Sequence, residues 1–409
     1  MTTHSELLTP QEIADILKPI GSARTLPRRA FYSREFYDFE VSELLTNTWM
    51  AVCFADRIPQ IGDALPLTVL GQPILLVRND TGAILSFHNV VPYDGCEAVM
   101  RPATGLKEIV TPYHGLTYDL SGRLTRAAFW NGMESGGDIT GLNCNLVSIR
   151  CAVWFGVIFV NLSGSAESFE EYLAPVTDFY ADYRLEALRM GRDEENQPIW
   201  HELKCRANWK TMYENYSPNV FHESFVHEMY RNSDHSPRVD GAGGKTYQEV
   251  VDERGFIGLQ YDNRIASSFF GELNSLPAVL RKDGSANPAN SIINMYPNWV
   301  VTVLGDHARI AFMLPDGAEL CTQYVATFFD QSVVAAKETL KDRQAALRLG
   351  VQARAEDNKI CESIQRARRS PAINSQFFNT FWDTPHYVLT QMFLRLYLEK
   401  RRHGNHRTE

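Results

Sequence analysis

Short runs of alternating apolar and polar residues fill the chain from about Trp49 to Leu162. Segments such as ALPLTVL, PILLVRN and AVWFGVIFVNL are separated by turn signals, among them the stretch Asn79-Asp80-Thr81-Gly82. A period of two residues is typical of strands with one buried face, and turn residues at short intervals join such strands. The pattern therefore predicts a small all-β domain over residues 46–163.

Helical patterns flank this domain on both sides. TPQEIADILKPI predicts a short helix with Thr9 as its N-cap and Pro10 at its first position, within an N-terminal segment of residues 1–45 that we expect to pack on the C-terminal domain. After Leu162 a helical segment, a second set of strands and a long charged helix, from about Ser332 to Arg368, follow in order. The polar residues 231–255 predict a long loop. Residues 164–409 thus form an α+β domain, with an antiparallel sheet around a long C-terminal helix.

Composition narrows the class of protein. The 409 residues are 44% hydrophobic and 22% charged with a net charge of −9, which is typical of a soluble globular protein and disfavours a nucleic-acid partner. No apolar run of about 18 residues and no signal-peptide pattern occur, so we expect no membrane association and a cytoplasmic protein. The seven cysteines form no CxxC pair, which disfavours an all-cysteine metal site.

Candidate chemistry lies in the stretch NWKTMYENYSPNVFHESFVH, which places His222 and His227 five residues apart. Two imidazoles and one carboxylate are the usual ligands of non-haem Fe(II) in oxygenases. Five residues turn an ideal helix by about 500°, so both rings converge only where the helix is irregular or one residue lies at its end. The pair alone is a weak signal for a metal site.

With its neighbours, this pair resembles the α (catalytic) subunits of Rieske non-haem iron oxygenases, whose motif NWK…(D/E)N…H-x4-H is present here. A later stretch, AEDNKICESIQRARRS, matches the helix that carries the family's third iron ligand, and Asp357 is the matching position. The resemblance implies a helix-grip catalytic domain with Fe(II) held by His222, His227 and Asp357. It also implies catalytic-pocket roles for Glu214 and Asn215.

The same resemblance identifies residues 46–163 as a Rieske-like β-domain, in which a [2Fe–2S] cluster takes two cysteines and two histidines. On the alignment of FHNV and PYHGLTYDLSGRL, the four ligand positions are Val91, Tyr93, Thr111 and His114. Because three of these side chains are not the family's ligands, the motif reads as degenerate. We therefore expect no [2Fe–2S] cluster in this chain, and a repacked domain in which Val91, Tyr93 and Thr111 fill the space.

The implied function is a subunit of a heteromeric oxygenase that hydroxylates a small organic substrate, with N- or O-demethylation as the preferred outcome. Electrons would come from the Rieske cluster of a homologous α-type partner in a ring-shaped hetero-oligomer, a trimer or hexamer, and from NAD(P)H through a ferredoxin or reductase. At the position of the family's acidic inter-subunit bridge, this chain has Asn219. Two alternatives stay open: a non-catalytic pseudo-subunit that supports a catalytic partner, and a helix-grip ligand-binding protein without iron.

Overall fold

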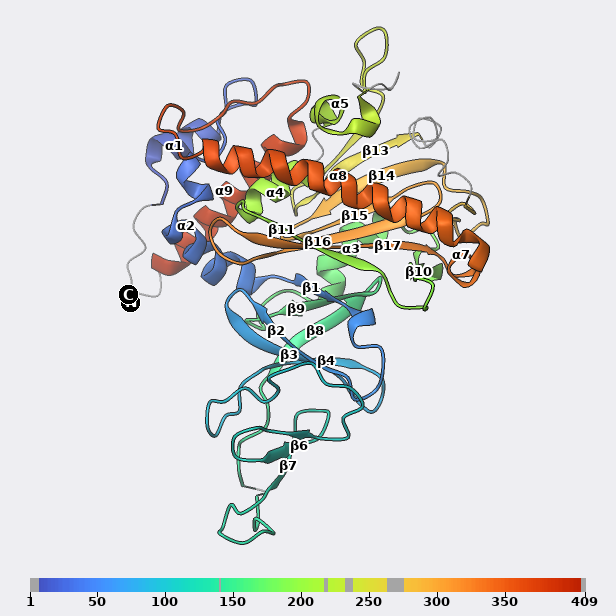
Figure 1. Cartoon of the computed structure of the whole chain (residues 1–409). Coiled ribbons are helices and arrows are strands. Elements are labelled where there is room, and N and C mark those ends of the chain that lie inside the picture. Colours follow the sequence, from blue (N-terminus) through green and yellow to red (C-terminus); the bar gives the residue numbers. More distant parts are fainter. Residues whose placement is uncertain (1–6, 140, 217–219, 232–237, 263–275, 406–409) are drawn as a thin grey trace. The chain divides into compact units, whose positions relative to one another are not determined.

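The computed structural model describes residues 7–139, 141–216, 220–231, 238–262 and 276–405, with side chains to residue 400. The chain forms two compact units, one of Leu45–Phe169 and one that joins Met1–Leu44 to Glu170–Glu409 (Figure 1). None of the helices in these ranges combines the length and the apolar character needed to span a bilayer.

The unit of residues 45–169 is all β. Its larger sheet has six strands in the order β1-β9-β8-β4-β3-β2, and a separate sheet has the order β5-β6-β7. A buried apolar cluster that includes Phe87, Val91 and Tyr118 packs between these strands. The strands are β1 (Met50–Phe54), β2 (Ala64–Val69), β3 (Gln72–Arg78), β4 (Ile84–His88), β5 (Ile109–Val110), β6 (Leu116–Tyr118), β7 (Leu124–Ala127), β8 (Ser148–Trp154) and β9 (Val157–Asn161).

The larger unit is built on an eight-stranded antiparallel sheet. Its order is β10-β17-β16-β15-β14-β13-β12, and β11 also pairs with β17. Nearly every residue of β15, β16 and β17 is buried, because the sheet is covered rather than open to water on one face. The strands are β10 (Leu188–Met190), β11 (Trp200–Cys205), β12 (Gln248–Asp252), β13 (Phe256–Asp262), β14 (Ala289–Met295), β15 (Trp299–Val303), β16 (Ala308–Pro315) and β17 (Cys321–Asp330).

One long helix, α8, crosses this sheet and contacts β11, β17 and α4 (Figure 1). Sheet and helix together confirm the expected α+β fold. The helices of the described chain are α1 (Pro10–Ile16), α2 (Arg34–Phe39), α3 (Phe169–Phe179), α4 (Trp209–Tyr216), α5 (Glu223–Val226), α7 (Gln331–Ala335), α8 (Leu340–Ala367) and α9 (Thr384–Asn405).

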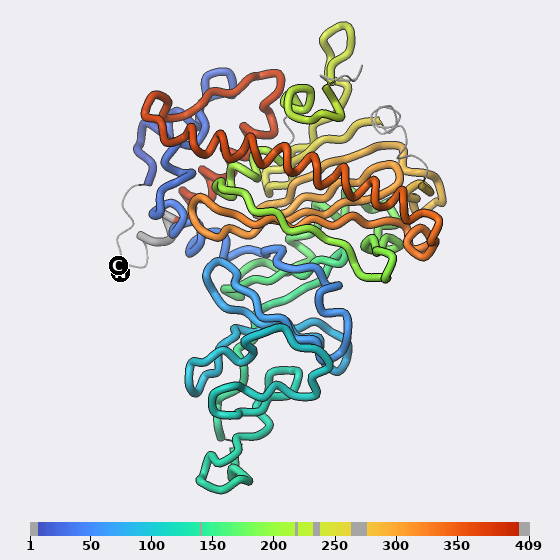
Figure 2. Tube along the Cα trace, in the orientation of Figure 1, coloured from blue at the N-terminus to red at the C-terminus, as the bar shows by residue number. Residues whose placement is uncertain are grey.

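The N-terminal residues dock on the larger unit. The predicted cap of α1 is confirmed, since Thr9 and Glu12 form a reciprocal capping box. In Figure 2 the blue N-terminal segment lies beside the red C-terminal helix, and the Tyr387 hydroxyl donates to the Lys18 carbonyl at 2.9 Å. Glu40 accepts the Trp209 indole N–H at 2.8 Å and pairs with the buried Lys210 ammonium at 2.6 Å. These bonds anchor the start of α4.

Two sequence-based predictions need correction. The expected helix from Ser332 to Arg368 is broken, because Ala336 has extended backbone at the end of α7 and a short 3₁₀ turn precedes α8. The expected loop of residues 231–255 contains the strand β12, which pairs with β13 in antiparallel register from Gln248 to Asp252. The glycine residues of this region made its sequence resemble a loop, whereas pairing with β13 stabilises the strand.

Candidate metal centre and pocket

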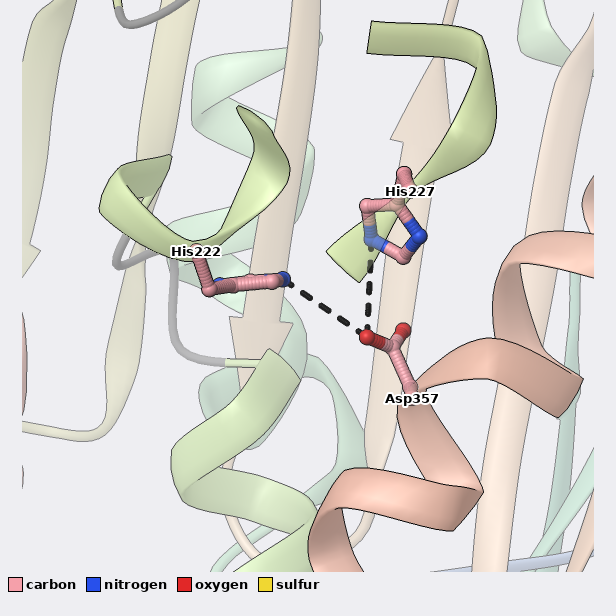
Figure 3. Close-up of side chains that lie close together, drawn as sticks. All are labelled: His222, His227 and Asp357. Atoms are coloured by element: carbon pink, nitrogen blue, oxygen red, sulfur yellow. Dashed lines mark ion pairs between the residues drawn. The ribbon is translucent and has the colours of Figure 1, made fainter. Parts of the chain in front are cut away.

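Three side chains from two segments converge in the larger unit. The ligand atoms of His222, His227 and Asp357 all lie within 4.8 Å of one another (Figure 3). The Asp357 carboxylate lies 3.6 Å from His222 Nε2 and 3.4 Å from His227 Nε2. Ligands that share one ion at right angles lie about 3 Å apart. The donor set and its spacing therefore fit one divalent first-row metal ion.

The backbone around α5 explains how histidines five residues apart converge. His222 ends a short 3₁₀ turn and is the N-cap of α5, while His227 follows the helix with φ −91° and ψ 120°. This break from helical geometry turns the second ring toward the first, with ring centroids 5.3 Å apart. Both rings thus sit at the ends of a single helical turn.

A buried ion pair fixes α5 against the sheet. Glu223 accepts from Arg238 Nε at 2.6 Å, and the Arg238 side chain is fully buried. The Arg238 guanidinium also stacks 4.0 Å from the centroid of the Tyr261 ring on β13. Since both charges are paired, the helix that carries the two histidines has a defined position.

Glu356 orients one of the imidazoles. Its carboxylate lies 2.9 Å from His227 Nδ1, on the opposite side of the ring from Asp357. A proton held on Nδ1 by this carboxylate leaves the Nε2 lone pair free for a metal. Glu356 was not among the site residues predicted from the sequence, although its position directly before Asp357 in the stretch AEDNKICESIQRARRS indicates that it lies near the site.

The two residues expected beside the metal on α4 have different surroundings. Asn215 lines the pocket, and its amide donates to Asp357 at 3.4 Å. Glu214 instead pairs with Arg368 at 2.8 Å and lies 3.4 Å from His386. Burial alone would raise the pKa of Glu214, but the charge of Arg368 and the bond to His386 lower it to about 2. Glu214 therefore links α4 to α8 and α9.

A pocket opens beside the three ligand residues. Its lining combines aromatic and aliphatic side chains from the sheet and α8 with several polar groups, as substrate pockets do. The lining residues are Asn215, Tyr216, Val220, His222, Glu223, His227, Met229, Tyr230, Tyr261, Ile292, Val300, Thr302, Leu304, His307, Arg309, Leu349, Gly350, Ala353, Arg354 and Asp357. Asn219, the expected bridge position, lies outside the described residues.

The four aligned cluster positions lie in the β unit. Val91 is fully buried in the apolar cluster and Thr111 is also buried. Tyr93 is 52% exposed and packs its ring edge against Trp130, so the expectation that it fills a buried space is wrong. His114 Nδ1 lies 2.7 Å from the Asp94 carboxylate. These four side chains supply one imidazole and no thiolate, which does not fit the ligand set of a Rieske cluster.

Comparisons with known families match both units. Residues 191–387 match the catalytic domain of the ring hydroxylating alpha subunit, and residues 48–131 match the Rieske [2Fe-2S] domain. The second match contradicts the expectation that this chain has no [2Fe–2S] cluster, and that expectation is withdrawn.

Individual relatives cover most of the chain. The oxygenase subunit of glycine betaine monooxygenase from Chromohalobacter salexigens is 25% identical over 75% of this chain and 71% of its own length. Choline monooxygenase from Arabidopsis thaliana is 24% identical over 87% of this chain and 78% of its own length. A solved quaternary ammonium Rieske monooxygenase that oxidises carnitine has a TM-score of 0.73 at 18% identity, with 96% of this chain and 99% of that chain covered.

Orientation of His227 by Glu356 is testable. We expect Glu356→Ala to weaken Fe(II) binding by about 10- to 100-fold, because the ring loses the acceptor that fixes its tautomer. Glu356→Gln keeps an acceptor oxygen and should lose much less. Anaerobic titration of Fe(II) against a competing chelator measures both, and equal affinity in Glu356→Ala and the wild type would contradict the assignment.

The low pKa of Glu214 predicts an acid-dependent stability. A free glutamate has a pKa of 4.5 and Glu214 has one of about 2, so the carboxylate stabilises the folded chain above pH 4.5 and loses this effect as the pH falls toward 2. We expect the unfolding free-energy difference between the wild type and Glu214→Gln to shrink by about 2 kcal/mol from about pH 6 to about pH 3. Urea unfolding at each pH measures it; a constant difference would refute the ion pair.

Proposed function

We propose that the chain is an α subunit of the Rieske non-haem iron oxygenase kind, and that it hydroxylates a small organic substrate at Fe(II) held by His222, His227 and Asp357. The observation that carries this proposal is the convergence of the three ligand atoms at the side of a pocket. When bound, Fe(II) would supply O₂ activation at the coordination positions that the three protein ligands leave open.

The surrounding residues prepare this site. Glu356 holds the His227 proton on Nδ1, and the Asn215 amide donates to the Asp357 carboxylate, so both ligands present fixed lone pairs. Ile292, Val300 and Leu304 line the pocket with apolar side chains, which suits the carbon skeleton of an organic substrate. Substrate C–H, O₂, two electrons and two protons give the hydroxylated product and water.

We propose N-demethylation as the outcome. The curated relatives are named for glycine betaine and choline, both of which carry N-methyl groups. Hydroxylation of an N-methyl carbon gives an unstable hemiaminal, which releases formaldehyde. Formaldehyde is therefore the product to measure.

The proposed electron source is the Rieske centre of a neighbouring, homologous α-type subunit in a hetero-oligomeric ring. Its electrons would derive from NAD(P)H through a ferredoxin or reductase. Inter-subunit electron transfer is described for the solved carnitine-oxidising monooxygenase, which supports this arrangement. Native mass spectrometry of the complex purified from its own cells tests it, since a ring of identical chains alone would contradict a second α-type subunit.

Removal of one ligand tests the catalytic role. We expect Asp357→Ala to lower formaldehyde release by the reconstituted complex at least about 100-fold, because two imidazoles alone do not retain Fe(II). The exposed Lys359 lies on the same helix, and Lys359→Ala serves as the matched control with unchanged turnover. Wild-type turnover in Asp357→Ala would instead indicate the non-catalytic supporting subunit.

A further inference from the structure

Two guanidinium groups line the pocket without a carboxylate partner. Arg309 lies on β16 and Arg354 on α8, and both face the cavity beside the three ligand residues. Two buried arginines near the pocket do have acidic partners: Arg238 pairs with Glu223, and Arg368 with Glu214. Among the ion pairs of the described residues, neither Arg309 nor Arg354 takes part in one.

Arg309 has unused hydrogen-bonding capacity. Its Nη2 group donates to the Ala346 carbonyl at 3.3 Å and lies 3.4 Å from His307 Nε2. His307 Nδ1 in turn lies 2.6 Å from Asp306, which fixes the ring with its proton toward the carboxylate and its Nε2 lone pair toward Arg309. The Arg309 Nε is buried with no hydrogen-bond partner among the described residues. A buried donor of this kind is costly unless a ligand satisfies it.

Arg354 adds a second charge from the facing helix. Its guanidinium stacks 3.9 Å from the centroid of the Tyr216 ring, which covers one face and leaves its edge for a ligand. Burial, aided by the positive charge of Arg354, lowers the pKa of Arg309 to about 10, so Arg309 stays protonated at neutral pH. A divalent metal at the three ligands would raise the positive charge of the pocket further.

Gly350 makes room for Arg309. It sits inside α8, where glycine costs about 1 kcal/mol relative to alanine. A Cβ atom at this position would lie 2.5 Å from Arg309 Nε and 2.6 Å from its Cζ. The helix therefore has its smallest residue where the guanidinium crosses it.

We propose that Arg309 and Arg354 form a subsite for the carboxylate of the substrate, whose other end then faces His222, His227 and Asp357. This inference rests on the proposed role of the pocket as the substrate site. It favours a trimethylammonium carboxylate of the glycine betaine kind over choline, which has a hydroxyl in place of the carboxylate.

Calorimetric binding of matched ligand pairs to the full chain tests the subsite. One pair is glycine betaine and choline, and the other is benzoate and benzamide. Within each pair the rest of the molecule is closely similar, and a neutral group replaces the carboxylate. We expect a carboxylate in at least one pair to bind about 10- to 100-fold more tightly than its counterpart. The preference should persist after removal of metal with a chelator, which separates the arginines from a metal ion as the binding group.

Variants assign the preference to these residues. Arg309→Met and Arg354→Met should each abolish most of it, and Gly350→Ala should weaken it while keeping the charge, because it displaces the Arg309 guanidinium. Arg348→Met, an exposed arginine of the same helix, is the matched control and should bind as the wild type does. Thermal melting identifies any variant that fails to fold, and the remaining variants then decide the result.

Two results would overturn the subsite: no carboxylate is preferred in either pair, or the preference survives in both arginine variants. Failure of the oxygenase proposal is distinguishable from these. In that case carboxylate binding is lost in Arg309→Met as expected, while the reconstituted wild-type complex produces no formaldehyde.

Discussion

The register of one helix against one sheet is the constraint on which the site depends. Gly350, Arg354 and Asp357 recur on α8 at intervals of four and three residues, so they share a face that looks into the pocket. The same helix is fixed further along its length, where Gln365 accepts the backbone N–H of Asn208 at 3.0 Å. A shift of one residue would turn Asp357 by about 100° away from both histidines.

Two groups of charged side chains around the site have different consequences for stability and binding. Glu40 with Lys210, Glu214 with Arg368, and Glu223 with Arg238 are each paired, and each pair joins elements that are separate in the sequence. Removal of one member of such a pair leaves an uncompensated charge and is strongly destabilising. Arg309 and Arg354 have no such partner among the described residues, which is the expected state of groups kept for a ligand.

The sequence predicted most of the architecture but only part of the site. Strand alternation, the Thr9 cap and the long charged helix were visible because they depend on local periodicity. Arg309 was not identified, because a strand pattern says which residues are buried and not which of them face a helix about 40 residues later in the chain. The strand β12 likewise depends on its pairing with β13. In the β unit, the sequence shows which residues stand at the four aligned cluster positions. The conclusion drawn from them, that the chain lacks a cluster, is contradicted by the match to the Rieske [2Fe-2S] domain.

The central claim is that His222, His227 and Asp357 hold a single iron ion in this chain. Anomalous diffraction at the iron absorption edge, from anaerobic crystals loaded with Fe(II), tests it most directly. The account predicts one strong peak roughly 2 Å from the Nε2 atoms of both histidines and from the Asp357 carboxylate. A fully loaded crystal with no anomalous density between these three side chains would contradict it.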